Sequence, residues 1–131
     1  MTAPGPFDGV GEPTSALRVE RSNDGDGVVL VLHGELDITT LADAERHVAS
    51  AEDAGADLLL DLTHLEFCDS SGVRLVLLAD ERARVAGQRL TIRLGDGPAQ
   101  RVFAALGLLD RLTVRDGSDD AATGTVPRTP R

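Results

Sequence analysis

Apolar residues in the middle of the chain follow the spacing of β-strands at several places. Residues 28–32 and 58–62 are almost unbroken aliphatic runs, which is typical of strands that are buried on both faces. Residues 90–94 alternate leucine or isoleucine with polar residues, which predicts a strand with one exposed face. Shorter alternating segments at 17–19 and 112–114 predict a further strand at each end of the fold.

Between these strands, apolar residues recur three and four positions apart, as they do on one face of an amphipathic helix. This spacing predicts three helices. The first begins at Thr39 or Thr40, with Asp43 completing a capping box. The second begins at Ser70, and the third has Pro98 in its first turn. The glycines expected to end the helices are Gly55, Gly87 and Gly107. The residues expected on the inner faces are Leu41, Ala44, Val48 and Ala51, then Val73, Val76, Leu77 and Ala83, then Ala99, Val102, Phe103 and Leu106.

The predicted order of elements is strand, strand, helix, strand, helix, strand, helix, strand. Strands separated by helices are parallel and joined by right-handed crossovers, whereas the first two strands form a hairpin around the turn at residues 23–27. The fold class is therefore α/β, with a mixed sheet of four to five strands, an opening antiparallel hairpin and about three packed helices. In such sheets the functional loops follow the carboxyl ends of the parallel strands, here at residues 34–40, 63–72 and 95–98.

The two ends of the chain lack this periodicity. Residues 1–15 are dense in Pro, Gly, Ser and Thr, so we expect a flexible arm there. Residues 116–131 are expected to form a flexible, acidic, proline-containing tail, which leaves residues 16–115 as the folded domain. The N-terminus lacks the basic start and apolar stretch of a signal peptide, and the single cysteine favours a cytoplasmic location.

Composition argues against several classes of function. The net charge of −9 opposes binding to nucleic acid and to anionic membranes, and no apolar run is long enough for membrane insertion. All 13 basic residues are arginine, which excludes mechanisms that need a catalytic or phosphate-binding lysine. One cysteine rules out an internal disulfide, and aromatic residues at 2% argue against a base-stacking surface.

The segment Asp69-Ser70-Ser71-Gly72 is the first candidate site. It follows a buried strand and opens a helix, where the first-turn N–H groups lack intrahelical partners and the helix dipole is positive. A phosphate on a serine here is expected to be received by those N–H groups, and Gly72 is expected to let the backbone approach it. The alternative is that Asp69 or Ser70 simply caps the helix, which is the commoner use of such residues.

The segment Gly34-Glu35-Leu36-Asp37, expected to form a turn after the first buried strand, is the second candidate. Crossover geometry places this turn beside the serine motif. Asp37 is then expected to hold the serine loop by accepting backbone hydrogen bonds, and to repel an added phosphate. The alternative is an ordinary turn in which aspartate is favoured by turn chemistry.

Taken together, the two motifs resemble the STAS domain of bacterial anti-sigma factor antagonists. A Gly-Glu-Leu-Asp turn comes first, and about thirty residues later a hydrophobic strand leads to Leu-Glu-Phe-Cys-Asp-Ser-Ser-Gly-Val at residues 65–73. A helix and another strand follow. The resemblance covers about residues 16–115, and its specificity comes from the spacing of both motifs within the same order of elements.

The resemblance implies a partner switch in transcription regulation, of the kind used in stress responses. In that family the unphosphorylated antagonist binds an anti-sigma factor, which is itself a serine kinase, and the sigma factor is freed. Phosphorylation of the first serine, here Ser70, blocks this binding, and a PP2C-type phosphatase reverses it. ATP is bound by the kinase, so the resemblance implies no catalytic residue and no cofactor for this chain. Asp37 and Asp69 match aspartates of the family.

The resemblance also implies a wider phosphorylation environment and partner-binding surface. Its expected members are Asp37, Asp69, Ser71, Gly72 and Arg74. Arg74 departs from the family, which mostly has a small or apolar residue there. We expect Arg74 to be solvated, and pairing with the phosphate or with acids of the partner is the alternative. The amphipathic C-terminal helix that is usual in the family is weak in residues 116–131.

Other chemistries have weaker support in the sequence. His33, His47 and His64 share no known metal-ligand spacing, so we expect no metal site. Ser70 with His64 and Asp69 lacks the Gly-x-Ser-x-Gly elbow of a hydrolase. A response-regulator receiver resembles this chain in size and acidity but needs a lysine, which is absent.

Two points stay open between alternatives. Cys68 is expected to be a buried structural thiol, with its pKa raised by Glu66 and Asp69, rather than a redox sensor. The chain as a whole is either the phosphorylated antagonist or a constitutive STAS interaction module, such as a small subunit of a transporter ATPase or of a stressosome-like assembly. In the second case Ser70 serves mainly as a helix cap.

Overall fold

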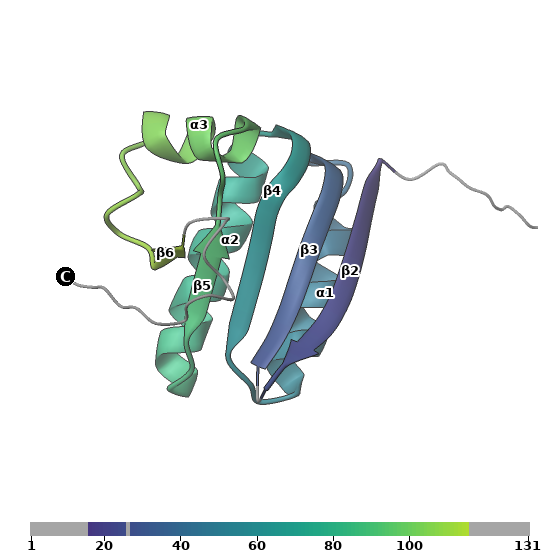
Figure 1. The fold of residues 1–131 in the computed structure, drawn as a ribbon, viewed down its shortest axis with the longest axis vertical. Helices are drawn as coiled ribbons and strands as arrows, with labels where there is room; N and C mark the ends of the chain where they lie inside the picture. The colour runs from purple at the N-terminus through teal and green to yellow at the C-terminus, as the bar shows by residue number, and fades with distance from the viewer. Residues whose placement is uncertain (1–15, 26, 116–131) are drawn as a thin grey trace, which may run out of the picture.

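The computed structural model describes residues 16–25 and 27–115, which form a sheet with helices packed against it (Figure 1). The expected arm at 1–15 and tail at 116–131 lie outside the described residues, as does Asp26 of the predicted turn. The strands are β2 (Leu17–Asp24), β3 (Gly27–Leu36), β4 (Leu58–Cys68), β5 (Leu90–Arg93) and β6 (Val114–Arg115). The helices are α1 (Leu41–Asp53), α2 (Ser70–Ala86) and α3 (Pro98–Ala105).

The sheet is mixed and its strands follow the order β2-β3-β4-β5-β6. β2 is antiparallel to β3, and every other neighbouring pair is parallel. The predicted order of elements, the opening hairpin and the three helices are therefore confirmed. In the view of Figure 1, α1 and α2 both lie behind the strands, and α3 lies at the end of the sheet where β4 finishes. No helix in the described part of the chain is long and apolar enough to cross a membrane.

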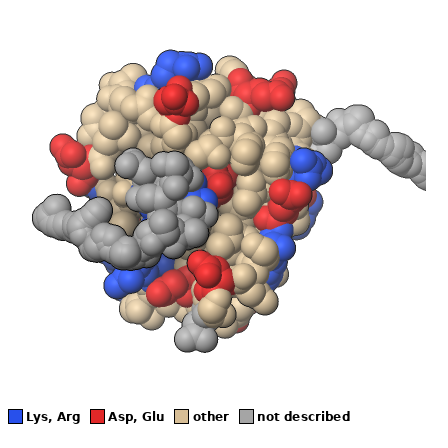
Figure 2. Space-filling model, in the orientation of Figure 1, with Lys and Arg blue, Asp and Glu red and all other residues tan. Residues whose placement is uncertain are grey.

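Charges of both signs lie on the described part of the sheet face that is turned toward the viewer in Figure 1. Figure 2 shows acidic and basic side chains interspersed over this side of the molecule, with uncharged surface between them. The opposite face, which carries α1 and α2, is where the strands direct their leucines.

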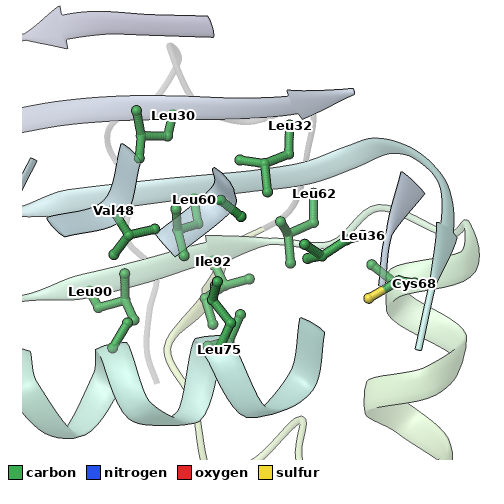
Figure 3. Close-up of a cluster of buried hydrophobic side chains, with 14 of the residues drawn as sticks. Leu30, Leu32, Leu36, Val48, Leu60, Leu62, Cys68, Leu75, Leu90 and Ile92 are labelled. Carbon is green, nitrogen blue, oxygen red and sulfur yellow. The ribbon is translucent and has the colours of Figure 1, made fainter. Parts of the chain in front are cut away.

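The core between the sheet and the two helices is aliphatic, as the low aromatic content requires. The strand side chains labelled in Figure 3 are at most 7% exposed. They and their helix neighbours include Leu30, Leu32, Leu60, Leu62, Ile92, Val48 and Leu75. Phe103 of α3 is fully buried, as predicted, and so is Leu75, which the sequence pattern did not select.

Both central strands are longer than predicted. The expected turn at 34–37 is strand as far as Leu36, and the expected loop at 63–69 is strand as far as Cys68. The reason is that parallel pairing continues beyond the apolar runs, with His33 opposite His64 and Leu36 opposite Cys68, across two irregularities in register. In this stretch of β4 every third residue, Leu62, Leu65 and Cys68, is buried, and the residues between them are more exposed.

The prediction that residues 90–94 form a half-exposed strand is wrong. All four residues of β5 are buried. β5 lies between β4 and β6, and the face that carries Thr91 and Arg93 is buried as well as the face that carries Leu90 and Ile92. Its polar side chains are accommodated by partners: Arg93 Nη1 lies 3.3 Å from Asp61 Oδ2 of β4, and Asp61 Oδ1 also accepts hydrogen bonds from the amide and hydroxyl of Thr63.

The last helix and strand are shorter than predicted. Leu106 was expected on the inner face of the third helix, but α3 ends at Ala105 and the side chain of Leu106 is 53% exposed. Gly107 follows with a positive φ, in agreement with its predicted role in ending the helix. The final strand has only two residues, and Leu112 is buried ahead of it rather than within it.

Gly34 occupies a position in β3 that requires glycine. Its φ is +103°, and a Cβ atom there would collide with the carbonyl oxygen of Ala16 beside it. We expect Gly34→Ala to lower the free energy of unfolding by roughly 3 kcal/mol, because backbone strain and collision add together. The measurement is urea unfolding followed by circular dichroism.

Gly87→Ala is the matched control for this experiment. Gly87 also has a positive φ, of 73°, but a Cβ atom there has nothing within 4 Å. We expect it to cost only about 1 kcal/mol, from backbone strain alone. Equal losses at the two positions would show that the close approach of Ala16 adds nothing.

Candidate functional site

The carboxyl ends of β3 and β4 bring the two sequence motifs together. Leu36 and Cys68 are partners in the parallel register, and the amide of Asp69 donates to the carbonyl of Leu36 at 3.3 Å. Asp37 follows the last residue of β3 and Asp69 follows the last residue of β4, so the chain leaves the sheet at neighbouring points. The Asp37 turn and the Ser70 motif therefore share one edge of the molecule.

Asp69 caps α2, which was one of the two interpretations left open by the sequence. Its backbone is extended, and its Oδ1 accepts from the amide of Ser71 at 2.8 Å. Its carbonyl oxygen accepts from the amides of Gly72 and Val73 at 3.0 and 3.3 Å. The expectation that the first-turn N–H groups are available to receive a phosphate is therefore wrong for Ser71 and Gly72, because Asp69 already engages them.

The two serines differ in accessibility. Ser70 is the first residue of α2 and is exposed, whereas Ser71 is partly buried. An enzyme that modifies this motif thus has freer access to Ser70. The Ser70 hydroxyl lies outside the hydrophobic core, so a change in its charge acts on the surface of the molecule.

Gly72 serves packing rather than the approach of a phosphate. It is buried in the first turn of α2, and a Cβ atom there would lie 2.8 Å from both Cys68 Sγ and Leu36 Cδ2. These two side chains lie together at one end of the core cluster (Figure 3). The absence of a side chain at Gly72 lets α2 start directly against the ends of β3 and β4.

Asp37 organises its own turn and not the serine loop, contrary to the expectation from sequence. Its Oδ1 accepts from the amide of Thr39 at 2.9 Å and from the Thr39 hydroxyl at 2.6 Å. The Thr39 hydroxyl is the main cause that holds the pKa of Asp37 below its ordinary value, with backbone amides of Thr39 and Thr40 adding to it. Asp37 is therefore a carboxylate at neutral pH.

The predicted capping box at the start of α1 does not form. Thr40 is the N-cap residue, but its side chain makes no cap hydrogen bond. Instead the Thr40 hydroxyl donates to the carbonyl of Glu35 at 2.9 Å and accepts from the amide of Asp37 at 3.1 Å. This hydroxyl thus ties the end of β3 to the start of α1, and it shapes the turn that presents Asp37.

The thiol of Cys68 is buried beneath this edge, in agreement with the structural role predicted for it. It is 7% exposed, and its Sγ donates to the carbonyl of Asp69 at 3.7 Å. Burial raises the pKa of Cys68 to about 11, with a smaller contribution from the carboxylate of Asp69. Burial, rather than the expected contribution of Glu66, is the dominant cause.

Most of the charged residues at this edge are acidic. Glu35 and Glu66 are exposed, and Asp37 and Asp69 are partly buried. Arg74 is exposed as expected, one helical turn beyond Ser70 and on the same face of α2. A negative group added to Ser70 enters a region in which four carboxylates already lie on β3, β4 and their loops.

The three histidines lie on β3, β4 and α1. The rings of His33 and His64 stack across β3 and β4 with centroids 4.9 Å apart, and His33 Nε2 lies 2.8 Å from Glu20 Oε1. His47 lies on α1. Within residues 16–25 and 27–115, no three side chains of the types that bind metals gather into a group.

A cavity of about 420 Å³ lies at the opposite end of the sheet, where the parallel strands begin. Its lining includes Gly27, Asp57, Arg89 and Arg115. It therefore has no part in the edge formed by Asp37 and Ser70.

The cap made by Asp69 gives a direct test of its structural role. We expect Asp69→Ala to lower the free energy of unfolding by about 0.5–2 kcal/mol, because the amide of Ser71 loses its acceptor. Asp69→Asn keeps an acceptor oxygen and is expected to stay close to wild type. Thermal unfolding of the three proteins checks this, and an Asn variant as unstable as the Ala variant would mean that charge, not capping, matters.

The raised pKa of Cys68 predicts that its thiol reacts slowly with alkylating reagents. With a pKa of about 11, about one thiol in a thousand is ionised at pH 8, so alkylation by iodoacetamide is expected to be at least tenfold slower than in urea. Because the folded-state pKa lies above the unfolded value, the thiol favours the folded state below about pH 9. This contribution is lost as the pH rises toward 11. Equal rates of alkylation with and without urea would contradict burial of the thiol.

Comparison with known proteins gives the family of the chain. The family model described as "Mlab, STAS domain" matches residues 19–114, which is nearly all of the described fold. No curated protein matches the chain.

Solved structures share the fold. An anti-sigma factor antagonist from Mycobacterium paratuberculosis has a TM-score of 0.72 at 21% identity, covering 82% of this chain and 92% of that one, and this likeness is one of fold. The anti-sigma factor antagonist SpoIIAA in its unphosphorylated form has a TM-score of 0.66 at 25% identity, covering 86% and 100%. The phosphorylated form of SpoIIAA, a cell fate determinant of Bacillus, has a TM-score of 0.61 at 26% identity, covering 83% and 97%. Because the family model spans almost the whole described fold and these structures share its architecture, the chain belongs to the STAS-domain family.

Proposed function

We propose that this protein is an anti-sigma factor antagonist that is switched by phosphorylation of Ser70. In its unphosphorylated form it binds an anti-sigma factor, which is also a serine kinase, and so frees a sigma factor. Phosphorylation of Ser70 ends this binding, and a PP2C-type phosphatase restores it. The observation that carries the proposal is the exposed Ser70 at the capped start of α2, in a fold for which SpoIIAA structures exist in both phosphorylation states.

The charges at this edge support a switch that acts by repulsion. A phosphate adds roughly −1.5 to −2 charges at neutral pH. Asp37 stays ionised because its pKa is lowered, and Asp69 already uses the amides of Ser71 and Gly72. The new charge therefore gains little from the first-turn amides, and Arg74 on the same face of α2 is outnumbered by the carboxylates at this edge. A partner surface shaped for a neutral hydroxyl has to bury this charge. The expected loss of binding is about 2–4 kcal/mol, or roughly 30- to 1,000-fold in affinity.

The proposed switch needs no change of fold. Ser70 lies outside the core cluster, and the Asp69 cap involves the side chain of Asp69 and not that of Ser70. The protein is the substrate of the kinase and the phosphatase and supplies no catalytic group. ATP belongs to the kinase, so the chain itself requires no cofactor.

A constitutive STAS interaction module, as part of a transporter ATPase or a stressosome-like assembly, is the second candidate. The Asp69 cap favours it, because the cap accounts for the aspartate of the motif without any phosphate. Exposure of Ser70 favours the switch, because a kinase can reach its hydroxyl in the folded protein.

The two functions predict different effects of Ser70→Asp. We expect the wild-type protein to recover a small ATP-binding serine kinase from lysate of the source bacterium, and the Asp variant to lose it. Ser50→Asp, at an exposed position on α1, is the charge-matched control and is expected to bind like wild type. Calorimetry with the purified kinase then measures the loss of affinity, expected to be roughly 30- to 1,000-fold.

Equal retention of one scaffold or transporter ATPase by wild type and Ser70→Asp would contradict the switch and support the constitutive module.

A phosphorylation assay with the purified kinase and labelled ATP shows which of the two serines of the motif is modified. Ser70→Ala is expected to abolish incorporation and Ser71→Ala to retain it.

A further inference from the structure

Two large apolar side chains are exposed at the same edge as Ser70. Ile38, directly after Asp37, is 72% exposed, and Phe67, directly before Cys68, is 46% exposed. Phe67 is the register partner of Glu35, so the two side chains belong to the neighbouring ends of β3 and β4. Single exposed apolar residues are common on protein surfaces, but two of them beside a candidate functional residue form a local feature that needs an explanation.

Neither side chain belongs to the buried core. The turn after β3 is held by hydrogen bonds of Asp37, Thr39 and Thr40, and Ile38 contributes no side-chain bond to it. On β4, the neighbour that packs into the core is Cys68, whereas Phe67 leaves almost half of its surface exposed. Both residues therefore expose apolar area that the fold leaves without cover in the described part of the chain.

The charges around these side chains indicate the chemistry of what covers them. Glu35 and Glu66, which flank Phe67 in register and in sequence, are exposed, and Asp37 and Asp69 lie beside them. An apolar centre with a charged rim is the usual anatomy of a protein interface, in which buried anchors supply affinity and rim charges supply specificity and association rate. Because the rim here is acidic, the complementary surface is apolar with arginine or lysine around it.

We infer that Ile38 and Phe67 are the apolar anchors of the surface that binds the anti-sigma factor, and that this partner offers an apolar socket edged by basic residues. The inference rests on the proposed function and identifies which side chains carry the binding. It also accounts for the strength of the switch. Anchors that exclude water make the interface dry around Ser70, and in a dry interface an unpaired phosphate is far more costly than in water.

The role of Ile38 and Phe67 is tested by calorimetry, which measures the affinity of the full-length protein for the kinase that the wild-type protein recovers from lysate. We expect Ile38→Thr and Phe67→Thr each to weaken binding at least tenfold, because threonine is more polar and has less apolar area than either side chain. Val85→Thr is the matched control. Val85 is 80% exposed near the far end of α2, about 22 Å along the helix from Ser70, and its replacement is expected to change affinity less than twofold.

The outcomes separate the inference from the proposed function. If both threonine variants bind like wild type while Ser70→Asp still binds weakly, the anchors are wrong and the switch stands. If the wild-type protein recovers no kinase, the proposed function fails and the inference fails with it. If sedimentation shows a wild-type dimer that the threonine variants dissociate, a second copy of the chain covers this edge and the inference is overturned. Matching thermal unfolding of all variants excludes loss of fold as the cause.

The acidic rim has its own test in the same assay. Glu35→Gln combined with Glu66→Gln is expected to weaken binding several-fold and to reduce its dependence on salt between 50 and 500 mM, roughly as rim charges do in other complexes. Asp53→Asn, an exposed acid at the end of α1, is the control and is expected to leave both quantities unchanged. If the double variant showed the same salt dependence as wild type, the inference that basic residues surround the partner's socket would be wrong.

Discussion

The parallel pairing of β3 and β4, carried through to their last residues, is the constraint on which the rest of the structure depends. Leu36 and Cys68 end the two strands opposite each other, and the amide of Asp69 donates to Leu36 across the gap. Gly72 is pressed against both side chains, where any Cβ would collide. Without this contact α2 would start farther from the sheet, and Ser70 would not share an edge with the Asp37 turn.

The apolar pattern predicted the order of elements, because core positions of strands and helices repeat with different periods. It failed at the strand ends. In β4, Leu65 and Cys68 point inward while Glu66 and Phe67 face out, and a mixed stretch of this kind has the composition of a loop. It also failed at Arg93, which is buried beside Asp61 of the neighbouring strand, 32 residues away in sequence. Position within a sheet is a tertiary property that local periodicity does not contain.

The sequence predicted those parts of the candidate site in which a residue has a single local hydrogen-bond partner. It did not predict those in which a side chain has two possible partners. Asp69 caps α2 because an aspartate before a helix has the amide of Ser71 within reach. The hydroxyl of Thr40 had both a capping role and the carbonyl of Glu35 available, and the geometry at the end of β3 selects the carbonyl. Ile38 and Phe67 escaped the sequence analysis because apolar residues are ordinarily assigned to the core, and only the folded chain distinguishes an uncovered one.

On the proposed function, this arrangement separates stability from recognition. The carboxylate of Asp69 satisfies an amide at the start of α2 whatever the state of Ser70, so the helix does not depend on the modification. The same carboxylate occupies an amide that otherwise could neutralise part of a phosphate. Asp37, kept ionised by the hydroxyl of Thr39, adds a second negative charge at the same edge. A phosphoserine therefore has only Arg74 of its own molecule on the same face of α2, against the carboxylates at this edge. A partner that has to bury the phosphate bears most of the cost. A switch of this kind needs only a surface that is neutral at one hydroxyl, apolar beside it and acidic around it.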